Sequence, residues 1–239
     1  MPDNFLTEQT LVPLLQRLVR HPSEQTDLQE ADPKVKAFIA DCVAPEIEKL
    51  GLGPDLSRCR YDTMGNLILE LGPATADRSI LFATYAMTHP AARMTDPFSA
   101  TIIETTSGPA VRGRGVAEQK TAMAAAFAAV AQAAADGLQG RIILTVLSAG
   151  ETGRHTAIEA MSGTLDTPPD LAIICLGTDS KIGAGNKGRI DIEISVEGRS
   201  VHSSTPSAGI DAIDGARHCL NALKTLDLGV PENPVFGAA

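Results

Sequence analysis

The chain has 239 residues, of which 44% are hydrophobic and 21% charged, and its formal net charge is -9. This is the composition of a globular protein of one or two domains, and the acidic charge with only 3% aromatic residues argues against a nucleic-acid partner, which needs clustered Lys and Arg. The 4 cysteines form no CxxC pair, so their spacing suggests neither a zinc site nor a disulfide framework. We recognise no signal peptide and no apolar run long enough for a membrane span. We therefore expect a reduced, soluble, cytoplasmic protein with no membrane partner.

Apolar periodicity predicts alternating helices and strands over the first three quarters of the chain. In chain order the predicted elements are helices over 6–19 and 33–50, strands over 59–61, 67–71, 79–84 and 100–104, a helix over 118–135, a strand over 141–147, a helix over 152–161 and a strand over 171–175. The apolar runs at 79–84, 141–147 and 171–175 predict buried strands, and 100–104 is expected at an edge of the sheet. The alanine-rich helix carries Met123 and Phe127 on its core side. This alternation predicts an α/β fold in which a mostly parallel sheet is flanked by helices on both faces.

The pattern changes near residue 188. Residues 189–197, RIDIEISVE, alternate with period two, which predicts a strand with one solvated face, and residues 209–226 have helical spacing. We therefore expect a second, smaller α+β domain from residue 189 to 239. One strand and one helix make a poor independent core, so we expect either a stabilising partner or a longer chain.

Ligands in open α/β sheets bind outside the carboxyl ends of the strands. The loops of interest therefore follow the strands 79–84, 141–147 and 171–175, together with the glycine-containing turn VRGRGVAEQK that runs into the alanine-rich helix. Glu118 lies where this turn becomes the helix. The helix dipole alone favours a carboxylate there, and a carboxylate is also a candidate metal ligand, so both interpretations of Glu118 remain open. Lys120 is expected to be an ion-pair partner of Glu118 or a surface charge.

Five segments of the chain contain short sequence motifs. They are DTMGNL at 62–67, DPF at 96–98, GRGVAEQK at 113–120, ETG at 151–153 and GRSVHSSTPSAGIDAI at 198–213. In this order they resemble the motifs of the M20 family of zinc-dependent aminoacylases, deacetylases and peptidases, which includes acetylornithine deacetylase and succinyl-diaminopimelate desuccinylase.

The resemblance implies a fold and an assembly. It identifies residues 1–188 as the N-terminal part of a catalytic α/β domain of the zinc-exopeptidase kind. It identifies residues 189–239 as the beginning of a lid and dimerisation domain, with the C-terminal part of the family's fold absent. A homodimer formed through the lid domain is implied as well.

The resemblance also implies zinc or another divalent metal as cofactor, because a bound metal lowers the pKa of water so that hydroxide attacks an amide carbonyl. The family's bridging carboxylate falls on Glu118, and a second metal carboxylate falls on Glu151. The family's lid histidine, which holds the substrate or the oxyanion, falls on His202. We therefore expect Glu151 and His202 to be catalytic and His202 to bind substrate.

Other positions of the family pattern carry different residues. The first histidine and aspartate ligands fall on Tyr85 and Met87, which offer neither imidazole nor carboxylate. The general base falls on Gly150. The next acidic ligand falls on Leu176, although Asp179 follows three residues later, and the last histidine would lie beyond residue 239.

Neighbouring residues offer a replacement for the missing ligands. His89, Glu118, Glu151 and His155 would make a one-metal set of nitrogen and oxygen donors. Glu151 and His155 would share one face if this segment is already helical. The alternatives are that His89 belongs to a loop and that His155 is a solvated helix residue.

Two functions follow from these residues. The first is a metal-dependent hydrolase of C–N bonds in small acylated amino acids or related amides, with an altered metal site. The second is a non-catalytic relative that keeps the scaffold for binding or assembly, or a fragment of a longer protein, because fold does not carry function when the site is lost.

Overall fold

The computed structural model describes residues 4–25, 32–53, 58–150, 155–183, 185, 192–227, 229–230, 232–235 and 237. The chain divides into two compact units, Met1–Lys181 and Ile182–Ala239. Within the described residues, no helix combines the length and the apolar character that crossing a membrane requires.

The first unit begins with the two predicted helices. The first is α1 (Glu8–Arg20), which buries its apolar stripe. The second is one continuous helical segment composed of α2 (Pro33–Phe38), the π-helical turn η1 (Ile39–Val43) and α3 (Ala44–Lys49). Its start follows from local chemistry, because Pro33 fits the first helical turn and the Asp32 side chain caps the backbone N–H of Lys34 at 2.8 Å.

A five-stranded sheet forms the centre of this unit, in the order β1-β2-β6-β3-β7. Its strands are β1 (Arg58–Tyr61), β2 (Leu67–Leu71), β3 (Ser79–Tyr85), β6 (Arg141–Leu147) and β7 (Leu171–Ile174). β3 pairs with β6 and β7 in parallel, whereas β2 pairs with β1 and β6 in antiparallel orientation. The sheet is therefore mixed, with a parallel half, rather than mostly parallel throughout. The pairing of β1 with β2 is antiparallel because a short turn joins them, and such a turn permits only antiparallel pairing.

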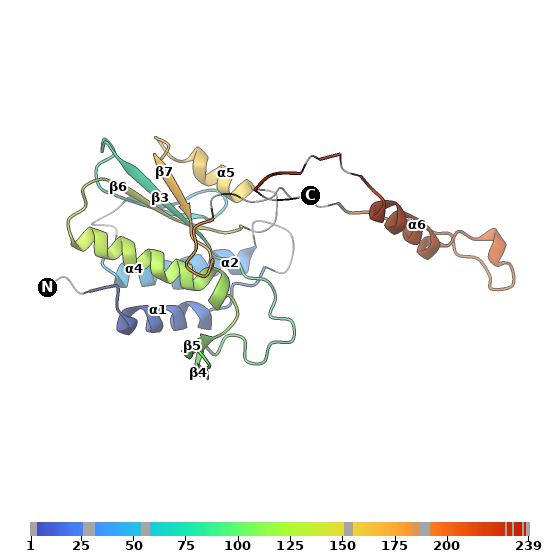
Figure 1. Cartoon of the computed structure of the whole chain (residues 1–239), viewed down its shortest axis with the longest axis horizontal. Helices are drawn as coiled ribbons and strands as arrows, with labels where there is room; N and C mark the ends of the chain where they lie inside the picture. Colours follow the sequence, from blue (N-terminus) through green and yellow to red (C-terminus); the bar gives the residue numbers. More distant parts are fainter. Residues whose placement is uncertain are drawn as a thin grey trace. The chain divides into compact units, whose positions relative to one another are not determined.

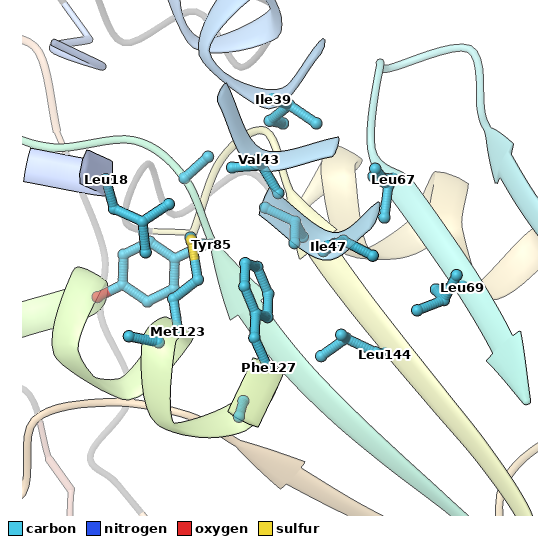
Figure 2. Packing of buried hydrophobic residues seen from close by; sticks show 14 of the residues in the cluster. Leu18, Ile39, Val43, Ile47, Leu67, Leu69, Tyr85, Met123, Phe127 and Leu144 are labelled. Carbon is cyan, nitrogen blue, oxygen red and sulfur yellow. The ribbon is translucent and has the colours of Figure 1, made fainter. Parts of the chain in front are cut away.

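Helices cover both faces of the sheet (Figure 1). The helices α1, α2 and α4 (Thr121–Ala135) lie on one side, and α5 (Thr156–Gly163) lies on the other. The core between the sheet and the first group is one apolar cluster, in which the ring of Tyr85 lies near Leu18, Met123 and Phe127 (Figure 2). Met123 and Phe127 are fully buried, as predicted.

Three sequence-based expectations about strands were wrong. The segment near residue 100 forms no edge of the main sheet, because β4 (Thr101–Thr105) pairs with β5 (Gly108–Arg112), an unpredicted strand, in a separate two-stranded sheet. All residues of β7 are exposed, although its apolar run predicted burial. In the second unit, the described residues 192–197 of the predicted strand 189–197 form no strand. An apolar or alternating run indicates a preference for β structure. Whether the strand is buried, and which strand it pairs with, depends on the elements packed around it in the fold.

The second unit contains the predicted helix, α6 (Ala212–Lys224), preceded by the short 3-10 turn η3 (Pro206–Ala208). The Asp211 side chain caps the helix by accepting from the backbone N–H of Ile213 at 2.8 Å. No residue of α6 is buried. Its apolar face therefore contributes little core to the unit.

Candidate functional site

The carboxyl ends of β3, β6 and β7 lie at one edge of the sheet because these strands run in parallel. Tyr85 at the end of β3 stands opposite Leu147 at the end of β6, and Ala83 stands opposite Ile174 at the end of β7. The sequence had predicted that the loops after these strands converge. The structure confirms that convergence for the described loop residues.

Glu118 is held at this edge by a π-helical turn, η2 (Val116–Lys120), that leads into α4. Gly115 precedes the turn with a left-handed backbone at φ +79°, a conformation that favours glycine. The segment after β7 is attached to the same turn, because the backbone N–H of Gly177 donates to the carbonyl of Glu118 at 2.8 Å. The backbone of the half-buried Glu118 is thus attached to the segment that follows β7, at the carboxyl edge of the sheet.

Lys120 is fully buried, so the expectation of a surface charge was wrong. Its Nζ donates to the carbonyls of Leu18 and His21, each at 2.9 Å, and lies 4.4 Å from the centre of the Phe38 ring. Burial lowers the pKa of the Lys120 amine from 10.5 to about 8. The carbonyls and the ring face supply the negative partners that a buried cation requires.

The two positions that would carry metal ligands in the family pattern lie at the end of β3 and just after it, and both are buried. Tyr85 is 6% exposed and Met87 is 2% exposed. A Cβ atom added to Gly150 would lie 2.7 Å from Cγ of Tyr85, closer than real Cβ contacts come. Position 150 therefore has no room for a side chain while Tyr85 keeps this conformation.

The remaining candidate ligands lie in different surroundings. His89 is exposed, and its backbone carbonyl accepts from Nε of Arg114 at 2.7 Å. His155 is exposed and has a left-handed backbone at φ 62°, immediately before α5. The helix thus starts after His155, and the expectation that Glu151 and His155 share a helical face does not apply. Glu151 itself lies outside the described residues.

The described residues do not by themselves fit a metal ion. Among them, no group of three or more His, Cys, Asp or Glu side chains lies close enough to hold one, so His89, Glu118 and His155 form no such group without a further ligand. The four-residue set that includes Glu151 remains a prediction.

His202, in the second unit, has a defined hydrogen-bond arrangement. The backbone N–H of Ser204 donates to Nδ1 of His202 at 3.2 Å, and the Ser204 hydroxyl lies 2.8 Å from the same nitrogen. Because a backbone N–H only donates, Nδ1 acts as an acceptor, and the neutral ring then carries its proton on Nε2. The exposed Nε2–H is a hydrogen-bond donor suited to an oxygen atom of a ligand.

Sequence reasoning gave no role to Asn66, whose buried amide organises one of the site loops. Its Oδ1 accepts from the backbone N–H of Ser148 at 2.7 Å, and its Nδ2 donates to Asp62 at 2.6 Å and to the carbonyl of Ala157 at 2.8 Å. Asn66 therefore joins the turn before β2 to the residue that follows β6 and to the first turn of α5. The signal was its place in the DTMGNL motif, which marks a turn but not its distant partners.

Comparison with known proteins supports the resemblance. A family model for the peptidase dimerisation domain of M20 proteins matches residues 184–233. A peptidase M20 domain-containing protein from Schizosaccharomyces pombe is 22% identical over 237 residues, which cover 98% of this chain and 56% of the relative. A succinyl-diaminopimelate desuccinylase from Phenylobacterium zucineum is 27% identical, over 92% of this chain and 58% of the relative.

A solved structure shares the fold. The M20 family metallo-carboxypeptidase from Sulfolobus solfataricus superimposes with a TM-score of 0.63 at 19% identity, covering 94% of this chain and 51% of that protein. The chain thus spans little more than half the length of these similar proteins.

Proposed function

We propose that this chain, which belongs to the M20 family of peptidases, contributes to hydrolysis of C–N bonds in small acylated amino acids, peptides or related amides. The observation that carries the proposal is the position of Glu118. It is the carboxylate of the GRGVAEQK motif, and it lies at the carboxyl edge of the parallel strands, where α/β proteins bind their ligands. Zinc or another divalent metal would supply the activated water.

Each predicted site residue has a proposed role. Glu118 and Glu151 are proposed as carboxylate ligands, with His89 and His155 completing an altered site, and Glu151 also as catalytic. His202 is proposed to bind the substrate and to stabilise negative charge on its oxygen. The arrangement at Nδ1 supports this role, because it leaves Nε2–H as a donor, and a positioned N–H donor stabilises negative charge on a carbonyl oxygen.

Replacing Glu118 with alanine is expected to abolish both metal retention and turnover, because the remaining donors hold a divalent ion weakly. Metal content per chain is measured by plasma mass spectrometry after equilibration with zinc, and turnover is measured with a panel of acylated amino acids. Glu104→Ala, which removes an exposed carboxylate of β4, is the matched control and should change neither quantity. Full activity of Glu118→Ala would contradict the proposed role.

A non-catalytic binding function is the second candidate, and the buried packing of Tyr85 and Met87 favours it. An aromatic ring and a thioether in the positions of metal ligands stabilise the core but do not activate water. This function predicts that the purified protein retains no zinc and that zinc does not raise its melting temperature. Retention of about one ion per chain, with a higher melting temperature in zinc, would count against this function.

A homodimer through the second unit is proposed from the match to the peptidase dimerisation domain and from the apolar face of α6. Ile213 and Leu220 are 82% and 60% exposed, and their spacing of seven residues places them on one face. Light scattering should give the mass of two chains. Ile213→Glu with Leu220→Glu should give one chain, whereas the exposed Asn221→Glu should leave the dimer intact. A monomer in the unmodified protein would contradict this proposal.

A further inference from the structure

The turn that presents Glu118 is a π-helix, which is rare in proteins and is frequent at functional sites. The backbone N–H groups of Gln119 and Lys120 both donate to the carbonyl of Gly115, at 3.3 and 2.9 Å. One carbonyl therefore serves two donors, and the wide turn gains less from its own hydrogen bonds than a regular α-helical turn. Contacts with other elements must supply the remaining stabilisation.

Lys120 supplies the first of these contacts. It connects the turn to the end of α1, because its Nζ donates to the carbonyls of Leu18 and His21. The last carbonyls of a helix have no partner within the helix and carry the negative end of its dipole. A buried ammonium satisfies both needs, so Lys120 and the end of α1 stabilise one another.

Gln119 supplies the second contact, in another direction. Its Nε2 donates to the carbonyl of Met87 at 2.6 Å, and its side chain is buried. It thereby connects the turn to the segment that follows β3. That segment is also attached to the residues that follow α1, because the backbone N–H of Thr88 donates to the carbonyl of Ser23 at 2.9 Å.

Three consecutive residues thus point to three different surroundings. Lys120 is directed at α1, Gln119 is directed at the end of β3, and Glu118 remains half-buried at the carboxyl edge of the sheet. Successive side chains of a helical turn point in different directions, so two buried attachments leave the third residue little freedom.

We propose that Lys120 is a positioning residue for Glu118, and that its two hydrogen bonds to the end of α1, together with Gln119, set where the Glu118 carboxylate lies. This inference rests on the proposed function only in treating Glu118 as the carboxylate of the site. The positioning itself follows from the contacts of Lys120 and Gln119.

Amide hydrogen exchange in the intact chain tests the proposal. Lys120→Met keeps most of the side-chain volume but removes both hydrogen bonds, and exchange at residues 115–119 should accelerate about tenfold or more, because each bond to a charged donor contributes more than a neutral one. Exchange in β6 should stay slow. Lys120→Arg, which keeps a cation and its donors, should restore most of the protection. Unchanged exchange at 115–119 in Lys120→Met would overturn the proposal.

A second measurement separates positioning from general stability. The ¹³C resonance of the Glu118 carboxyl carbon should move in Lys120→Met, return towards its original position in Lys120→Arg and stay in place in Glu70→Gln, a variant destabilised at a distant part of the sheet. Equal movement in Glu70→Gln would reduce Lys120 to a general structural role and overturn the proposal.

Two further outcomes remain decisive. If Lys120→Met does not fold, Gln119→Leu replaces it, because this change removes only the attachment to Met87. Gln119→Leu should move the resonance of the Glu118 carboxyl carbon. An unmoved resonance in this variant would contradict the proposal. A protein without hydrolytic activity would contradict the proposed function alone, because neither readout depends on turnover.

Discussion

Replacing Glu70 with alanine is expected to lower the free energy of unfolding by about 3–5 kcal/mol, the cost of breaking a buried ion pair by removing one partner. The Glu70 side chain is 1% exposed and accepts from Nη1 of Arg60 at 2.6 Å and from Nε of Arg141 at 2.9 Å. Arg141 is itself buried, with 3% of its side chain exposed. Without Glu70, the Arg141 guanidinium would remain buried without a carboxylate.

Through the same two arginines, the removal of Glu70 should also affect a segment outside the sheet. Nη2 of Arg60 donates to the carbonyl of Thr164 at 2.9 Å, and Nη1 of Arg141 donates to the carbonyl of Thr167 at 3.2 Å. Glu70 therefore orients two side chains that attach the segment between α5 and β7 to the three strands β1, β2 and β6. Its removal should loosen this segment as well as destabilise the sheet.

Urea unfolding of Glu70→Ala measures the loss. The control is Lys49→Ala, which removes a 61% exposed partner of Glu46 and should cost less than about 1 kcal/mol. A loss as small as in the control would show that solvent screens the network. The loss in Glu70→Gln should be smaller than in Glu70→Ala, because an amide oxygen still accepts from the arginines.

The pH dependence of stability gives an independent check. Burial by itself raises the pKa of the Glu70 carboxyl, but the hydrogen bonds and charges of Arg141 and Arg60 outweigh it and lower the pKa below its ordinary value. The unfolded chain then binds the proton more readily, so the stabilisation is present above the unfolded pKa and is lost as pH falls through the folded pKa. Glu70→Gln should show a weaker loss of stability on acidification than the unmodified protein.

Glu70 also illustrates what the sequence predicts and what it does not. The run LILEL predicts a strand correctly, and the parallel half of the sheet follows from the alternation of strands and helices. The partners of this single charge lie on the neighbouring strands, Arg60 ten residues away and Arg141 71 residues away, and periodicity contains no information about such pairs. The mixed character of the sheet was missed because a strand's own residues do not specify its direction.

In the candidate site, too, some features could be predicted from the sequence and others could not. Motif order identified the turn that contains Glu118, and strand order predicted the edge of the sheet where it lies. Burial of Lys120 was not predictable, because a lysine after a glutamate in a helical turn is usually solvated. Only the position of α1 beside the start of α4 explains it, through the carbonyls of Leu18 and His21.

Replacing the exposed Gly150 with alanine is expected to lower the free energy of unfolding by about 1–3 kcal/mol, the usual cost of forcing an extra carbon against well-packed atoms. Gly150 has no left-handed backbone that would require glycine. Its constraint is therefore spatial, because the added Cβ would lie 2.7 Å from Cγ and 3.0 Å from Cδ1 of Tyr85. These atoms lie at the base of a buried ring, which cannot move aside as the end of a flexible side chain would.

A double-mutant cycle with Tyr85→Ala tests this explanation. Tyr85→Ala alone should cost about 3–5 kcal/mol through the lost ring and the remaining cavity. In that background Gly150→Ala should cost almost nothing, because the conflicting ring atoms are gone, so the two changes should be strongly coupled. Gly163→Ala in α5 is the matched control; no atom lies within 4 Å of an added Cβ there, so the change should be neutral or slightly stabilising. Equal costs of Gly150→Ala in both backgrounds would contradict the steric explanation.

The result bears directly on the choice between hydrolysis and binding. In the M20 pattern the general base falls on position 150, and a glutamate there needs more room than an alanine. If the cycle shows strong coupling, no acidic side chain fits at 150 unless Tyr85 changes first, so a single reversion cannot restore the base. Any hydrolysis by the protein must then draw its proton acceptor from another residue, and Glu151, its immediate neighbour in sequence, is the candidate to replace next.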